Sequence, residues 1–131
     1  MIDDSVSTAA ANSLKKEDSS VKLFSAEINN THTEFAINSY TDRFFIIITQ
    51  TGNIGTLVSV EKDTAKVEKE TAEVYSIRVL LGKDDEDVHI AARFLAGQLN
   101  LPKPILFSFC IKDLGLVALK NILQKLKEHL Q

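Results

Sequence analysis

The 131-residue chain has an ordinary globular composition, and its formal net charge of −3 gives little support to non-specific nucleic-acid binding. Its length predicts one domain. No apolar run approaches the roughly 20 residues that cross a bilayer, and the polar N-terminus lacks the pattern of a secretory signal. A single cysteine cannot form an internal disulfide, so the composition favours the cytosol or the nucleus.

The N-terminal part predicts a tail followed by strands. Residues 1–20 are rich in Ser, Ala, Asp and Lys, which predicts a disordered tail because little apolar surface can be buried. Apolar and polar residues alternate over 22–28 and 34–38, so we expect two strands joined by a short turn at 29–32. The run 44–48 is apolar on both faces and β-branched, as in a central strand covered on both sides.

Two further strands and a charged segment follow. Residues 56–60 predict a strand, and residues 75–81 predict another with alternating faces. Between them, residues 61–73 are mostly charged, with opposite signs interspersed. This pattern predicts a solvated loop or a frayed exposed helix.

The C-terminal part predicts two helices around a strand. Apolar residues recur at helical spacing over 88–99, which Pro102 and Pro104 end, and again over 114–130. The apolar run 105–111 lies between them and predicts a second buried strand. We therefore expect one α+β domain over 21–131, with a mostly antiparallel sheet of about six strands and two helices packed on one side. A doubly wound parallel sheet would need regular alternation of strand and helix, which is absent.

The stretch TQTGNIGTLVSV, residues 49–60, has the glycines of a phosphate-binding loop. A phosphate loop also needs a lysine directly after its last glycine, whereas Thr56 follows Gly55 here. A hairpin turn needs only positions with positive φ, which Gly52, Asn53 and Gly55 can supply. We therefore expect a hairpin that turns 44–50 back onto 56–60, and no nucleotide or other cofactor.

The acidic run DDEDVH, residues 84–89, has possible ligands for a hard cation. Consecutive side chains at a helix start fan outward, however, and the spaced oxygens of a calcium loop are missing. The favoured interpretation is a helix start whose carboxylates accept hydrogen bonds from free backbone N–H groups and complement the positive helix end. We expect no metal site.

The sequence gives no positive evidence for an enzyme. Cys110 lies within a strand, where we expect a buried and unreactive thiol. Asp42 and Asp113 are isolated, so no pair of carboxylates stands out for acid–base chemistry. An unrecognised catalytic site would need a concave pocket with convergent polar groups, which sequence cannot show.

Two features favour interaction with other proteins. The leucines at 116, 119, 123, 126 and 130 form a long stripe on the last helix, which packs into the core or meets a partner. Antiparallel strands also end in edges that something must cover. The expected partner-binding residues are Asn53, Ile54, Leu116, Leu119, Lys120 and Leu123.

TQTGNIGTLVSV at 49–60 and VLLGKDDEDVHIAARFLA at 79–96, followed by Lys112-Asp113 and Leu119-Lys120, make a recognisable set. In this order and spacing they resemble the proteasome assembly chaperone 3 family, over about residues 21–130. The tail at 1–20 and the segment 61–73 do not share the resemblance. The resemblance implies an antiparallel β-structure with two helices and no catalytic residues.

The same resemblance implies a role in protein assembly. Members of the family pair with a sister of similar fold, proteasome assembly chaperone 4, and some self-associate as homodimers. The heterodimer binds α-type subunits of the 20S proteasome, promotes formation of the α-ring and leaves before the particle matures. The alternative from another class is a small dimeric scaffold of the roadblock or longin type. Those folds normally place a helix among or before the early strands, whereas the first helical pattern here begins near Val88.

Overall fold

The computed structural model describes residues 20–67 and 70–130. The elements are, in chain order, β1 (Ser20–Ile28), β2 (Thr31–Ser39), β3 (Phe44–Thr49), β4 (Thr56–Val67), β5 (Glu70–Leu81), α2 (Glu86–Leu99), β6 (Ile105–Cys110) and α3 (Leu116–Leu130). The predicted order of five strands, a helix, a strand and a helix is confirmed. The predicted tail lies outside the described residues except for Ser20, which begins β1.

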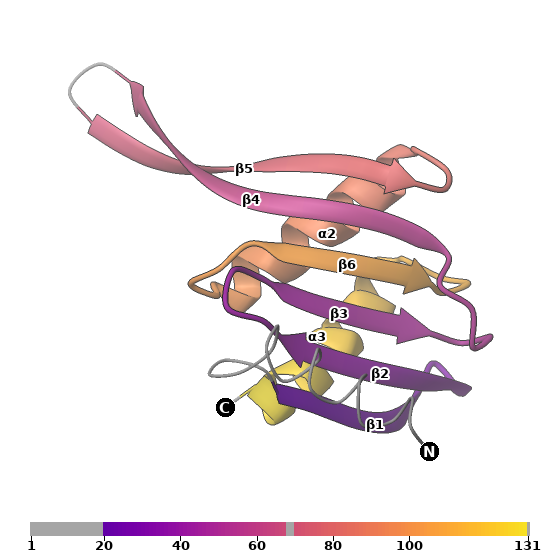
Figure 1. Cartoon of the computed structure of the whole chain (residues 1–131). Helices are drawn as coiled ribbons and strands as arrows, with labels where there is room; N and C mark the ends of the chain where they lie inside the picture. Colours follow the sequence, from indigo (N-terminus) through magenta and orange to yellow (C-terminus); the bar gives the residue numbers. More distant parts are fainter. Residues whose placement is uncertain (1–19, 68–69, 131) are drawn as a thin grey trace, which may run out of the picture.

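The six strands form one sheet in the order β1-β2-β3-β6-β4-β5. All neighbours are antiparallel except β3 and β6, which are parallel. Both helices lie on the same side of the sheet, with α2 behind β4 and β5 and α3 behind the half that contains β1 (Figure 1). The predicted α+β fold, with a mostly antiparallel sheet, is therefore confirmed.

The core lies between this sheet and the two helices. Alternate strand residues face the helices, and small residues on α2 let it approach the sheet closely. The buried strand residues include Ile28, Phe35, Ile37, Ile46, Ile48, Val58, Val60, Ile105, Phe107 and Phe109. The helices contribute Val88, Ala91, Ala92, Leu95, Ala96, Ala118, Leu119, Ile122 and Leu126. Burial of each large aliphatic side chain stabilises the fold by about 1.5–3 kcal/mol.

The turn between β1 and β2 consists of two asparagines. Asn29 and Asn30 have φ values of 52° and 66°, as a type I′ turn requires, and Ile28 pairs directly with Thr31. Asparagine tolerates this left-handed region better than most residues. The predicted short turn is confirmed, although it is narrower than the expected 29–32.

The expected loop or frayed helix at 61–73 is wrong for 61–67 and 70–73, which are strand, while 68–69 lie outside the described residues. The chain continues as β4 through Val67 and returns as β5 from Glu70, and this hairpin extends beyond the rest of the sheet (Figure 1). Within it, Ser76 donates a hydrogen bond to Asp63 across the strands, with Oγ and Oδ2 2.6 Å apart. Glu61, Lys62 and Asp63 are exposed. A stretch of strand that is exposed on both faces, as at 61–63, needs no alternation of apolar and polar residues, so its sequence shows only that it is solvated.

Candidate interaction surface

The segment 50–55 connects β3 to β4, but these strands are not neighbours. β6 lies between them, parallel to β3 and antiparallel to β4. The expected hairpin that folds 44–50 directly onto 56–60 is therefore wrong. Because β6 comes much later in the chain, local sequence cannot reveal that it takes the place beside β3. The segment 50–55 crosses the end of β6 instead.

Glycine makes this crossing possible. Gly52 and Gly55 have φ values of 84° and 75°, so their predicted positive φ is confirmed. Asn53 is not among the described residues with positive φ, and that part of the prediction is wrong. A Cβ atom on Gly55 would lie 2.2 Å from the carbonyl oxygen of Phe109 in β6. The backbone can pass over β6 only where a side chain is missing.

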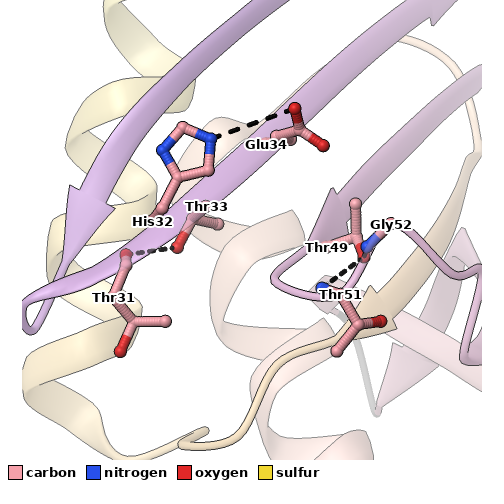
Figure 2. A network of polar contacts seen from close by, with 7 residues as sticks. All are labelled: Thr31, His32, Thr33, Glu34, Thr49, Thr51 and Gly52. Atoms are coloured by element: carbon pink, nitrogen blue, oxygen red, sulfur yellow. Dashed lines mark hydrogen bonds and ion pairs between the residues drawn. The ribbon is translucent and has the colours of Figure 1, made fainter.

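Polar side chains at the end of β3 hold the crossing segment in place. Thr49 Oγ1 accepts hydrogen bonds from the backbone N–H groups of Thr51 and Gly52, at 3.2 and 2.9 Å (Figure 2). Gln50 Nε2 donates to Thr33 Oγ1 at 3.1 Å, and Gln50 Oε1 accepts from the backbone N–H of Lys112 at 2.9 Å. The Gln50 side chain thus ties β2 to the segment between β6 and α3.

Replacing Gln50 with Ala is expected to lower the free energy of unfolding by about 1–2 kcal/mol, because one partly buried and one exposed hydrogen bond are lost. Gln98 is exposed on α2, so Gln98→Ala should change it by no more than about 0.5 kcal/mol. Urea denaturation of both variants measures the difference. Equal losses in the two variants would contradict the role given to Gln50.

The face of the sheet that points away from the helices carries a set of apolar side chains. We call it the open face and define it by Leu23, Ala36, Phe45, Ile47, Leu57 and Leu106. Strand register places Leu23 beside Ala36 and Ala36 beside Ile47, in a row across β1, β2 and β3. Leu23 is 76% exposed and the others are half-buried. No helix or strand among residues 20–67 and 70–130 covers this face.

The open face is hollowed over β1–β3 and bordered by the crossing segment. The hollow has a volume of about 410 Å³, and its lining includes Leu23, Glu34, Ala36, Ile47 and Thr49. Ser108 lies beside Ile47 in the register, and its hydroxyl donates a hydrogen bond to the carbonyl oxygen of Ile54. The structure therefore places the predicted partner-binding residues Asn53 and Ile54 at the border of this face. Both are exposed, Ile54 by 53%.

The other predicted partner-binding residues lie on α3, on the opposite side of the sheet. Leu116 is 56% exposed, Lys120 is exposed and Leu123 is half-buried. Leu119 is 2% exposed and belongs to the core, so the expectation of a partner contact is corrected for this residue. Leu119, Ile122 and Leu126 are buried on the side of α3 that faces the sheet, whereas Leu116 is exposed. The predicted residues thus form two separate surfaces.

The acidic run 84–89 and Cys110 differ in part from what the sequence predicts. His89 Nε2 lies 2.6 Å from Asp84 Oδ1, and among the described residues no group of three or more His, Cys, Asp or Glu could hold a metal ion. Asp85 is the N-cap of α2 but its side chain makes no capping hydrogen bond, contrary to the expectation. Cys110 is half-buried rather than buried, because it points to the open face, where its Sγ contacts Thr51 Oγ1 at 3.0 Å.

Sequence reasoning does not find the open face as a site, although the sequence contains its signal. The run 44–48 predicts a strand covered on both sides, and the helices cover only the side of Ile46 and Ile48. Phe45 and Ile47 belong to the other side. An apolar face beyond the needs of the core is the observation that points to a partner.

A search of the described helices for one with the length and the hydropathy of a membrane span finds none.

The family model for proteasome assembly chaperone 3 matches residues 46–129. The chain belongs to this family. Proteins named proteasome assembly chaperone 3 from Nematostella vectensis and Bos taurus are both 29% identical to it, over 78% and 77% of this chain and 82% and 84% of their own lengths. The human protein of that name is 26% identical over 69% of this chain and 75% of its own length.

A solved structure shares the fold of this family member. It is the crystal structure of a novel chaperone complex for yeast 20S proteasome assembly. The TM-score is 0.65 at 16% sequence identity, and the match covers 83% of this chain and 97% of the other. The matched family region, 46–129, includes the crossing segment, β6, α2 and α3 up to His129.

Proposed function

We propose that this chain promotes assembly of the 20S proteasome α-ring, as a heterodimer with a second chaperone of similar fold that resembles proteasome assembly chaperone 4. It acts by transient binding of α subunits in the cytosol or nucleus, without catalysis. The observation that supports this most is the open face. Three of its six residues lie on β3 and β6, the central strands of the sheet, and the others lie on β1, β2 and β4.

A second sheet is the occupant that best suits the open face. Side chains from two facing sheets interdigitate across about 10 Å, which buries extended rows of apolar residues such as Leu23–Ala36–Ile47. Full burial of a residue such as Ile47 or Leu106 contributes about 1.5–3 kcal/mol. A chaperone with the same sheet supplies such a surface, and the yeast protein that shares this fold was crystallised as a chaperone complex. A second copy of this chain would offer the same face, so we also expect a homodimer in isolation.

Transient action requires only differential binding. A chaperone that leaves must bind the assembly intermediate more tightly than the finished ring. An arriving subunit that occupies the same space removes the contact without any chemical fuel. No catalytic residue is needed for this cycle.

Affinity purification of a tagged copy from its own cell extract tests the proposal. We expect the eluate to contain proteasome α subunits together with a second small chaperone, and mature particles to be depleted. Mass spectrometry identifies both. Recovery of neither would reject the proposed function.

A further inference from the structure

The outer face of α3 combines apolar and basic side chains. Leu116 and Val117 in its first turn are 56% and 67% exposed. Lys120 and Lys127 follow on the same side of the helix, about 10 Å apart along its axis. Between them lie the half-buried Leu123 and the exposed Gln124. We call Leu116, Val117, Lys120, Leu123, Gln124 and Lys127 the α3 stripe.

The first turn of the α3 stripe is unusual for a helix surface that faces only water. The first turn of α3 contains no acidic residue, although the positive end of a helix favours one. Instead it exposes two large apolar side chains, and Lys120 stands in the next turn. Lys127 in the last turn complements the negative helix end, but Lys120 is too far from that end to do so. Helix stability alone therefore does not explain the exposed Leu116 and Val117.

The α3 stripe also has the shape and the free charge of a binding surface. Lys120, Leu123, Gln124, Lys127 and Glu128 line a shallow groove of about 360 Å³. Neither Lys120 nor Lys127 forms an ion pair with a described residue, whereas Glu128 is paired with Lys125 at 3.9 Å. The groove thus presents two available ammonium groups on either side of an apolar floor. A complementary surface places carboxylates around an apolar side chain.

We propose that the α3 stripe is the surface that binds the proteasome α subunit, through an acidic patch with an apolar centre on that subunit. This inference rests on the proposed function. The open face and α3 lie on opposite sides of the sheet (Figure 1). A second chaperone on the open face therefore leaves the α3 stripe accessible, and both partners bind at once.

The test uses the full chain paired with its second chaperone and individually purified α subunits of the 20S proteasome as probes. Lys120→Glu, Lys127→Glu and the double variant reverse the charge of the α3 stripe. Arg93→Glu is the matched control, because Arg93 is exposed on α2 and the charge change is the same. Fluorescence anisotropy at low and high salt gives the dissociation constants.

We expect each single reversal to weaken binding of the recognised α subunit about tenfold, and the double variant to weaken it further. Arg93→Glu should stay within about twofold, all variants should keep the second chaperone, and wild-type affinity should fall with rising salt. Unchanged affinity of the double variant would overturn the inference and leave the proposed function standing. A wild-type pair that binds none of the α subunits would reject both.

Discussion

Replacing Ile47 with Glu is expected to abolish pairing with the second chaperone while the chain remains folded. Ile47 lies in the central row of the open face, beside Ala36 of β2 and Ser108 of β6. An unpaired carboxylate in an apolar interface must give up its water, which costs several kcal/mol. The dissociation constant should rise at least about 100-fold. Isothermal titration calorimetry of the purified partners measures it.

The matched control is Ile90→Glu. Ile90 is 49% exposed on α2, on the other side of the sheet. The same change of side chain there should leave the dissociation constant within about twofold, because no interface is proposed at that position. Thermal unfolding of both variants, each without its partner, shows whether the fold is kept. If Ile47→Glu stays folded and pairs normally, the open face is not the dimer interface.

Replacing Gly55 with Ala is expected to be strongly destabilising, by about 4 kcal/mol. Part of the loss is the positive φ of 75°, which costs an L-residue about 1–2 kcal/mol. The larger part is steric, because the new Cβ would lie 2.2 Å from the Phe109 carbonyl oxygen and 2.9 Å from the Cys110 Cβ. The crossing segment must then lift off β6, which breaks the contact between Ser108 and Ile54.

Gly52 separates these two contributions. Its φ is 84°, but no atom lies within 4 Å of a Cβ built there. Gly52→Ala should therefore lose only the conformational term, about 1 kcal/mol. Urea denaturation of the two variants gives both values. Equal losses of unfolding free energy in the two variants would show that the close contact with β6 adds nothing to the cost of a side chain at Gly55.

Much of the fold follows from local patterns in the sequence. The alternation in β1 and β2, the apolar runs of β3 and β6 and the helical spacing of α2 and α3 predict the order of elements and the α+β class. What local patterns omit is which strands become neighbours. β6 inserts between β3 and β4 through contacts far apart in the chain. The stretch 49–60 therefore predicts a hairpin, whereas the structure crosses a third strand there.

The charged segment shows a second limit. The exposed residues 61–63 belong to a strand that is held by its partner in the hairpin rather than by the core. Hydrophobic periodicity is the main sequence signal for secondary structure, and such a strand does not show it. The charge pattern then shows that the segment is exposed to water, but it does not show whether the segment is a strand, a helix or a loop.

The candidate site can be predicted only in part. The predicted residues Asn53 and Ile54 border the open face, but the sequence pattern assigns the apolar residues of that face to a buried strand. A strand covered by a partner has the same sequence pattern as one covered within its own chain. In the last helix, one leucine stripe in the sequence contains both buried and exposed residues. Leu119 belongs to the core, whereas Leu116 lies on the surface. Only the position of the helix start relative to the sheet separates them.

Methyl cross-saturation tests pairing through the open face most directly. The chain is deuterated except for its isoleucine methyl groups, and the protonated second chaperone is irradiated. If the open face is the interface, the signals of Ile47 and Ile54 should lose intensity, while that of Ile90 on α2 should keep it. Loss at Ile90 with unchanged signals at Ile47 and Ile54 would contradict the proposed pairing through the open face.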